Sequence, residues 1–192
     1  MSLTDINIRE KDFHNKLQSK KKGRFENIFY KAIYNCSEDF FKYLKNYAKD
    51  SFILDYGCGV GSFVKKVAEY NPEKITGIDI SEVSIEKAKK NTRELKIETE
   101  FKVENCEKTS FHDNSFDIVY GSGIIHHLQI EKSLDEILRI LKPDGNLLFI
   151  EPLGTNPIIN LYRKITPKAR SIDEHPLVKK DLDYIKKKFI DI

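Results

Sequence analysis

Three glycines alternate with other residues in the stretch ILDYGCGVGSF. Gly57, Gly59 and Gly61 directly follow an apolar run that carries one acid, Asp55. Because glycine lets the backbone turn sharply or lie against a ligand, this spacing indicates a turn that binds a cofactor. Dinucleotides are bound by the pattern G-x-G-x-x-G, but Ser62 stands where the third glycine is needed. NAD is therefore disfavoured as the ligand of this turn.

A second acid follows the next apolar run, which ends in GIDIS. A carboxylate at this strand end can accept hydrogen bonds from both hydroxyls of a ribose, so Asp79 is a candidate ribose ligand. We place its neighbour Ile80 in the same cofactor site. Asp79 would also suit NAD, and the alternative is a plain turn residue before a helix that Ser81 caps.

Two adjacent histidines, His126 and His127, follow the fourth apolar run in the segment GSGIIHHL. A neutral imidazole can take a proton near neutral pH, so both are candidate catalytic bases. A packing or hydrogen-bonding role is the alternative for each. The three cysteines are an odd number without metal-ligand spacing, so we predict no disulfide framework and no metal site.

Short apolar runs alternate with amphipathic segments from residue 51 onward, and this order predicts where the candidate residues lie. Strands are predicted over 51–57, 74–80, 100–105, 116–122 and 145–152. Helices with one apolar stripe each are predicted between them, and KPDG is expected to close the last of these helices. The pattern is typical of an α/β fold, a Rossmann-like doubly wound and mostly parallel sheet.

The two ends of the chain differ from this core in their pattern of apolar residues. Residues 1–50 are predicted to form an N-terminal helical lid or extension, because aromatic residues recur there at helical spacing. Residues 51–152 are the predicted cofactor-binding core. Residues 153–192 are predicted to be a helical segment, with one helix opened by Pro157 and another beginning at Pro176.

Composition narrows the class of partner. With 33 Lys and Arg against 30 Asp and Glu, the net charge is only +3, so nucleic acid is not favoured as the partner. No apolar run approaches the length of a membrane span, and the N-terminus lacks the apolar core of a secretory signal. We therefore expect a soluble, cytoplasmic protein.

The motifs together resemble those of the class I S-adenosylmethionine-dependent methyltransferases, in particular the methyltransferase type 11 group. The resemblance rests on the acid-x-G-x-G-x-G spacing, on GIDIS, and on the run VENCEKTSFHDNSFDIVYGSGIIHHL, and it covers about residues 50–152. It implies S-adenosylmethionine as the cofactor. By the same resemblance, Asp55 supplies negative charge near the cofactor's cation, and Cys58 lies in the turn beside it.

The resemblance also assigns the residues that follow the third and fourth strands. Asn105 stands where the family has an acid that accepts a hydrogen bond from adenine, and its side-chain oxygen can still accept one. The backbone N–H of Cys106 would face the adenine ring, and Phe111 would pack beneath the ring or in the core. Gly121 and its two neighbours would line the methionine end of the cofactor.

The predicted sheet departs from the family in its number of strands. The family normally has seven, whereas this chain reaches only FIDI after the fifth, so the sheet is apparently truncated after strand five. A homodimer could cover the exposed sheet edge. Glu151, just past the fifth strand, is expected either to orient the methyl acceptor or to cap the strand.

The function that the resemblance implies is methyl transfer to a small-molecule acceptor, with a lean toward an apolar or quinone-like one. The alternatives are a non-catalytic S-adenosylmethionine-binding module, a nucleic-acid methyltransferase using the basic segments QSKKKGR and KKKF, and an NAD oxidoreductase. A general base is needed only where the acceptor is a hydroxyl or a protonated amine.

Overall fold

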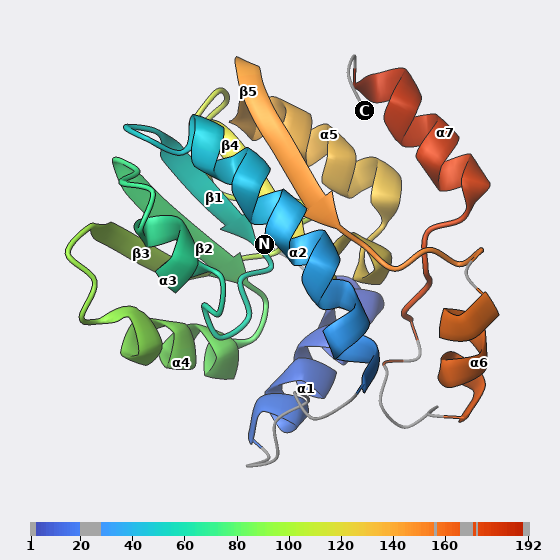
Figure 1. The fold of residues 1–192 in the computed structure, drawn as a ribbon. Helices are drawn as coiled ribbons and strands as arrows, with labels where there is room; N and C mark the ends of the chain where they lie inside the picture. The colour runs from blue at the N-terminus through green and yellow to red at the C-terminus, as the bar shows by residue number, and fades with distance from the viewer. Residues whose placement is uncertain (1–2, 20–27, 156, 166–170, 172, 190–192) are drawn as a thin grey trace.

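The fold is known from a computed structural model, which describes residues 3–19, 28–155, 157–165, 171 and 173–189 (Figure 1). The elements in chain order are α1 (Asp5–Ser19), α2 (Ile28–Tyr47), β1 (Phe52–Tyr56), α3 (Val64–Ala68), β2 (Lys74–Asp79), α4 (Glu82–Thr92), β3 (Glu98–Val103), β4 (Phe116–Ser122), the 3-10 turn η2 (Ile125–His127), α5 (Ile130–Ile140), β5 (Leu141–Ile150), α6 (Pro157–Ile165) and α7 (Lys179–Lys188).

The five strands form one sheet in the order β3-β2-β1-β4-β5, and every neighbouring pair is parallel. The chain therefore builds outward from β1 in one direction and then returns to build outward from β4 in the other. Ligands of such sheets bind at the carboxyl ends of the strands where the order reverses, here between β1 and β4. The prediction of a doubly wound parallel sheet is confirmed.

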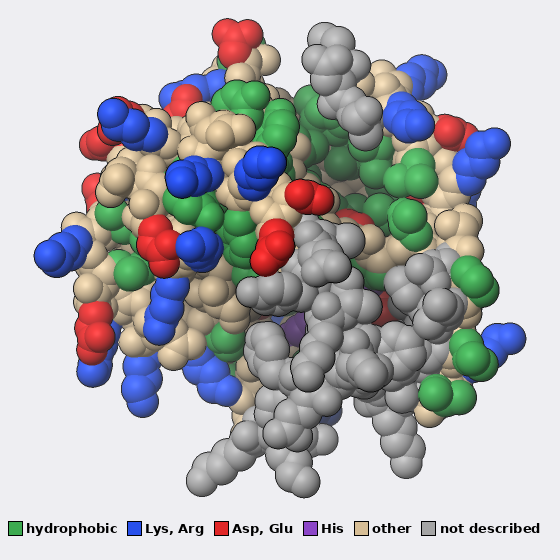
Figure 2. Space-filling model, viewed as in Figure 1, with side chains coloured by type: hydrophobic (Ala, Val, Ile, Leu, Met, Phe, Trp, Pro, Cys, Tyr) green, Lys and Arg blue, Asp and Glu red, His purple; other side chains and the backbone are tan. Residues whose placement is uncertain are grey.

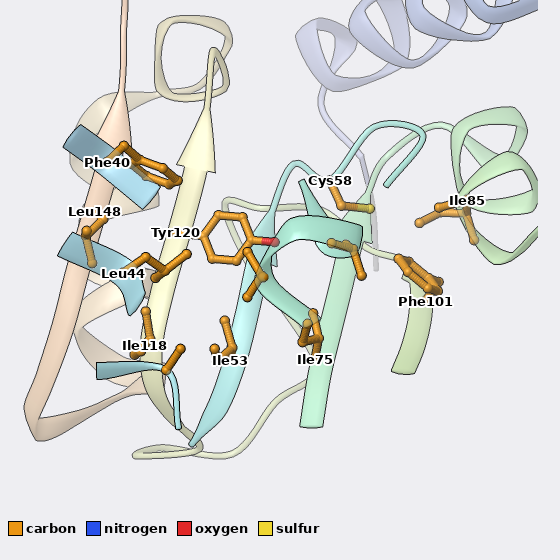
Figure 3. Close-up of a cluster of buried hydrophobic side chains, with 14 residues drawn as sticks. Phe40, Leu44, Ile53, Cys58, Ile75, Ile85, Phe101, Ile118, Tyr120 and Leu148 are labelled. Carbon is orange, nitrogen blue, oxygen red and sulfur yellow. The ribbon is translucent and has the colours of Figure 1, made fainter. Parts of the chain in front are cut away.

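Successive side chains of the central strands enter two separate cores, one on each face of the sheet. Ile53 of β1 faces the cluster that α2, α3 and α4 complete, whereas its neighbour Leu54 faces the cluster on the side of α5. Ile118 and Val119 of β4 divide in the same way. Figure 3 shows the first cluster, with Tyr120 at its centre. Both faces are covered, so most residues of these strands are apolar, and Asp55 of β1 is a buried exception.

The N-terminal helices differ in position, which corrects the expectation of a lid over residues 1–50. Phe40, Leu44 and Ala48 of α2 are buried in the core against the sheet. This helix lies in front of the sheet in Figure 1 and belongs to the body of the fold. Only α1 lies beyond the carboxyl ends of the strands, where a lid would be. The aromatic spacing of α2 predicted a helix, but not which surface it covers.

The segment KPDG does not close the last core helix as predicted. Helix α5 ends at Ile140, and β5 begins at the next residue, with Leu141 paired to Phe116. The pairing register shifts between Phe116 and Ile118, so Pro143 falls at an irregularity of the strand. Proline lacks an N–H and is tolerated in a sheet at such bulges.

The other boundaries lie close to those predicted. Ser81 caps α4, because its side chain accepts a hydrogen bond from the backbone N–H of Ser84 at 3.1 Å. Both C-terminal helices are present, although α7 begins three residues after Pro176. The part of the chain that the structure describes contains five strands, as predicted, and residues 190–192 of FIDI lie outside it.

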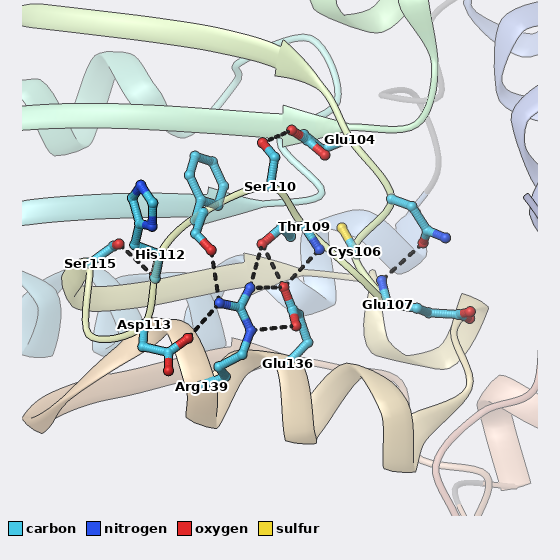
Figure 4. Close-up of polar contacts among 12 residues, drawn as sticks. Glu104, Cys106, Glu107, Thr109, Ser110, His112, Asp113, Ser115, Glu136 and Arg139 are labelled. Atoms are coloured by element: carbon cyan, nitrogen blue, oxygen red, sulfur yellow. Dashed lines mark hydrogen bonds and ion pairs between the residues drawn. The ribbon is translucent and has the colours of Figure 1, made fainter. Parts of the chain in front are cut away.

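Two side chains of α5 hold the loop between β3 and β4, as Figure 4 shows. Thr109 donates to Oε1 of Glu136 from its backbone N–H at 2.7 Å and from its hydroxyl at 2.6 Å. Arg139 pairs with Glu136 at 2.6 Å and also donates to the backbone oxygen of Phe111 and to Asp113, both at 2.8 Å. These contacts fix the loop that begins at Asn105.

Candidate cofactor and active site

The glycine turn follows β1, and all three glycines have positive φ angles. A Cβ on Gly57 would lie 2.5 Å from Ile124, and one on Gly61 would lie 3.3 Å from Ala88. A Cβ on Gly59 would meet none of the described atoms within 4 Å. Two of the glycines are thus needed for packing, and Gly59 is the position where the backbone is open to a ligand.

Asp79 faces this turn from the end of β2. Its Oδ2 accepts a hydrogen bond from the N–H of Gly59 at 2.9 Å, and its Oδ1 accepts one from the N–H of Ser81 at 2.8 Å. Burial raises the pKa of Asp79, although these N–H groups oppose the shift. The carboxylate is thereby fixed beside Gly59 with lone pairs to spare, as a ribose ligand requires. Ile80 follows it and is partly buried.

Asp55 lies within the sheet at the start of the turn and is only 3% exposed. Burial raises its pKa to about 7, the Tyr120 hydroxyl opposes this shift, and the Asp79 charge adds to it. Its Oδ2 is buried without a hydrogen-bond partner among the described residues. A buried carboxyl in this condition would be stabilised in its charged form by a nearby cation.

Asn105 follows β3, and both ends of its amide contact the protein. Its Oδ1 accepts a hydrogen bond from the N–H of Glu107 at 2.9 Å, and its Nδ2 donates to Asn7 of α1 at 3.1 Å. One lone pair of the oxygen is thus used within the loop, and contact with adenine stays a prediction. The backbone oxygen of Cys106 accepts a hydrogen bond from the Tyr56 hydroxyl, which ties this loop to β1.

Three other predicted site residues contribute to the packing of the fold. The thiol of Cys58 is in the core, while its N–H donates to the backbone oxygen of Ile78 at 2.8 Å and joins the turn to β2. A Cβ on Gly121 would lie 2.8 Å from the backbone oxygen of Tyr56, so β4 needs glycine there for close packing. Phe111 packs edge to face on Phe116 in the second core.

His126 is buried on η2 and held by Glu151. Its Nδ1 lies 2.7 Å from Oε2 of Glu151, and because a carboxylate only accepts, Nδ1 carries the proton. The other oxygen of Glu151 accepts the N–H groups of Ile124 and Ile125, both at 2.8 Å. Glu151 therefore caps η2 and orients His126, and of the two roles considered for it, capping is the closer to what the structure shows.

His127 is also buried, and its Nδ1 lies 3.1 Å from Oε2 of Glu10 on α1. Burial lowers the pKa of His127, and Glu10 opposes this shift. The ring lines a cavity of about 550 Å³ whose wall also includes Ile6, Gln129 and His175. The cavity wall combines apolar with charged side chains.

Helix α1 contributes residues that the sequence did not single out, namely Asn7, Glu10, His14 and Asn15. Asn15 accepts a hydrogen bond from the Ser81 hydroxyl at 2.6 Å, so α1 is attached to the N-terminus of α4 as well as to Asn105 and His127. The four-residue spacing of Glu10 and His14 puts both on one helix face, so the sequence could have indicated that these two side chains lie together.

A family model described as "Methyltransferase domain" matches residues 54–149. The chain belongs to this methyltransferase family. The match spans the glycine turn, Asp79, the loop after β3 and both histidines, so the resemblance to class I S-adenosylmethionine-dependent methyltransferases is confirmed.

The methyltransferase has curated relatives with different named acceptors. A demethylmenaquinone methyltransferase of Lactobacillus johnsonii is 33% identical over 87% of this chain and 73% of its own length. A phosphoethanolamine N-methyltransferase of Arabidopsis thaliana is 33% identical over 58% of this chain and 24% of its own. A solved S-adenosylmethionine-dependent methyltransferase from Methanosarcina mazei has a TM-score of 0.61 and 28% identity, covering 76% of this chain and 82% of that one.

The chain spans about a quarter to two fifths of the length of several curated relatives that it matches. Among the described residues, no helix combines the length and apolar character needed to cross a membrane.

Proposed function

We propose that this methyltransferase binds S-adenosylmethionine and transfers the methyl group to a small-molecule acceptor. One observation carries the proposal. The backbone at Gly59 opens to free space, and the Asp79 carboxylate is fixed beside it by the Gly59 N–H. An acid held next to an open glycine turn can bind the ribose of a cofactor that crosses the turn.

The two carboxylates at the glycine turn fit this cofactor chemically. Asp79 would bind the ribose hydroxyls, and Asp55 would place a buried negative charge near the cationic end. When bound, the cofactor supplies a methyl group that its sulfonium charge already activates. The protein has then to hold the acceptor in line with that methyl group and to exclude water. Helix α1, which covers the strand ends, is suited to the second task.

His126 is the better placed of the two candidate bases. Glu151 holds the proton on Nδ1, which leaves the Nε2 lone pair available, and an imidazole oriented by a carboxylate is a common arrangement for a base. The role applies only if the acceptor is a hydroxyl or a protonated amine. His126→Gln is expected to lower turnover at least about 10-fold with unchanged cofactor affinity. Unchanged turnover with an acceptor that needs deprotonation would exclude this role.

Isothermal titration with S-adenosylmethionine and its demethylated product tests cofactor binding directly. Gly59→Asn keeps a residue type that tolerates positive φ but puts a side chain into the open space, so we expect binding to fall at least about 10-fold. Glu86→Gln, on the exposed face of α4, is the matched control and should bind as the wild type does. A folded wild-type protein that takes up neither compound at millimolar concentration would overturn the proposal.

The acceptor is proposed to be a small molecule that is apolar or quinone-like, supported by the demethylmenaquinone methyltransferase whose similarity covers most of this chain. Transfer of a labelled methyl group to a panel containing a demethylated quinol, a sterol and phosphoethanolamine would test it. Strong labelling of phosphoethanolamine alone would replace the quinone-like acceptor with a charged one. Cofactor binding without transfer to any acceptor would instead favour a non-catalytic binding module.

Nucleic acid is a weaker proposal for the acceptor. The basic tract at 20–24 lies outside the described residues, and Lys188 of the C-terminal tract pairs with Asp135 at 2.6 Å. Lysine and arginine side chains are interspersed with acidic ones on the face shown in Figure 2. An affinity for RNA or DNA that fell steeply with salt would revive this alternative. A cytoplasmic location and a homodimer also stay proposals.

A further inference from the structure

We propose that Glu10, His14 and His127 form a binding site for one divalent transition-metal ion, which joins α1 to the body of the methyltransferase. The three potential ligand atoms all lie within 4.8 Å of one another. They come from α1 and from η2, which are more than a hundred residues apart in the sequence. The site lies next to the proposed cofactor site, because His14 and His127 are near enough to Asp79 for their charges to oppose the rise in its pKa.

The distances suit a shared ion. Oε2 of Glu10 lies 3.1 Å from Nδ1 of His127 and 3.6 Å from Nε2 of His14. Zinc bonds to nitrogen and oxygen measure about 2.0–2.1 Å, so two ligand atoms of a tetrahedral site lie about 3.3 Å apart. These two distances lie on either side of this value, and all three ligand atoms lie within 4.8 Å of one another, so side-chain adjustments would bring them into a tetrahedral arrangement.

Two of the three ligand atoms are buried without a hydrogen-bond partner among the described residues. These are Oε2 of Glu10 and Nδ1 of His127, whose side chains are 7% and 8% exposed. They face each other 3.1 Å apart, so a proton carried on Nδ1 would also join them. Buried polar atoms are rarely left without a partner, because the loss of hydration is costly. A cation between them would satisfy both.

The surroundings hold the ligands in place. The Ser171 hydroxyl donates to Oε1 of Glu10, which leaves Oε2 directed at the histidines. Glu10 and His14 are one helical turn apart on α1 and therefore share a face. Hydrogen bonds to the second atom of a ligating group are typical of metal sites, where they fix its orientation.

The donor set indicates which ion would bind. Two imidazoles and one carboxylate suit zinc, cobalt(II) or iron(II), whereas magnesium and calcium prefer oxygen ligands alone. The region offers one further carboxylate, because Glu174 lies 3.9 Å from Nε2 of His126 beside His127. This carboxylate adds negative charge around the site, which favours a divalent cation.

Cobalt(II) titration of protein freed of metal by a chelator tests the site by its visible absorption, without an activity measurement. We expect one saturable equivalent with the bands of a four- or five-coordinate ion. Loss of a supporting residue typically weakens a metal site 10–100-fold, so loss of a ligand in Glu10→Gln or His14→Gln should weaken binding at least about 10-fold. His112→Gln, on the exposed loop before β4, is the matched control and should bind as the wild type does.

Absence of a saturable band in the wild type would overturn the proposal and leave Glu10 and His127 as a simple polar pair. Equal binding by the wild type and both ligand variants would also overturn it, because the ion would then lie elsewhere. Hydrogen exchange supplies a second measurement in the folded protein. Zinc should slow exchange across residues 5–19 in the wild type and in the His112 control, but not in His14→Gln. Equal slowing in all three proteins would contradict the link between α1 and the body.

Discussion

Asp55 is an acidic residue whose burial disfavours its charged form. It lies inside the sheet with its pKa raised to about 7, mainly because burial penalises the charged carboxylate. In the unfolded chain the same group titrates near 3.8. Between these values the folded protein holds a proton that the unfolded chain releases, so folding becomes less favourable as the pH rises.

The free energy of unfolding is therefore expected to fall between about pH 4 and pH 7 and to level off above pH 7. The contribution of Asp55 is roughly 2–4 kcal/mol. Asp55→Asn removes the titration and should flatten the profile, although Asp79, with its own raised pKa, adds a slope of the same sign. Urea unfolding of both proteins from pH 4.5 to 8.5 measures this. Parallel profiles for the two proteins would contradict the assignment.

Substitutions of the turn glycines are expected to affect different properties, namely stability at Gly57 and cofactor affinity at Gly59. Gly57→Ala brings a Cβ to within 2.5 Å of Ile124 at a positive φ, so the free energy of unfolding should fall by about 2 kcal/mol or more. Gly59→Asn has open space and a tolerated φ, so stability should change by less than about 1 kcal/mol while cofactor affinity falls. Thermal unfolding with and without cofactor separates the two effects, and a destabilised Gly59→Asn would show that its space is not free.

At the scale of elements, α1 is connected to the strand ends chiefly by polar contacts. Asn7, Glu10 and Asn15 reach three different parts of the body, namely the loop after β3, η2 and the start of α4. The exposed ion pair of Lys11 with Glu82 adds little, because solvent screens such pairs. A helix held in this way can open locally at lower cost than the core elements.

Asn15→Ala is expected to loosen α1 over the cofactor site. Loss of its hydrogen bond to Ser81 costs about 1 kcal/mol, which corresponds to roughly fivefold faster dissociation of the demethylated cofactor if α1 must open for release. Stopped-flow release measures the rate. Lys16→Ala, on the same helix, is the control. An unchanged release rate in Asn15→Ala would show that α1 does not gate the site.

The loop after β3 is the other element that positions the site, and α5 holds it. Arg139→Ala would leave the Glu136 carboxylate, 9% exposed, without its charged partner. Because Arg139 itself is about one third exposed, the expected loss is moderate, about 1–3 kcal/mol in the free energy of unfolding. A double-mutant cycle with Glu136→Gln measures the pair directly, and additive effects of the two substitutions would contradict a coupled loop anchor.

For the whole molecule, the burial of α2 means that the fold extends N-terminal to residue 51. Leu44→Ala should lower the free energy of unfolding by about 2–5 kcal/mol, as for other buried leucines. Tyr47→Ala, at an exposed position of the same helix, should change it by less than about 0.5 kcal/mol. A single cooperative transition is expected in both variants. Separate unfolding of α2 would contradict its place in the core of the fold.

Local patterns in the sequence predicted much of this molecule. The runs of apolar residues located all five strands, with β4 at its observed bounds, and Ser81 marked the start of α4. The glycine turn and Asp79 were predicted as neighbours, because the carboxyl ends of adjacent parallel strands meet at one edge of the sheet. These features depend on residues close in the chain, so the sequence alone determined them.

Only the tertiary structure decided which polar atoms face one another. Glu10 meets His127 across more than a hundred residues, and Glu151 turns back to hold η2, so neither contact leaves a pattern in a local window. Pro143 was expected to close the preceding helix but lies in β5, at the irregularity between the paired residues Leu141 and Asn146. Periodicity encodes which face of an element is buried, whereas the partner of a buried polar group is set by how elements pack.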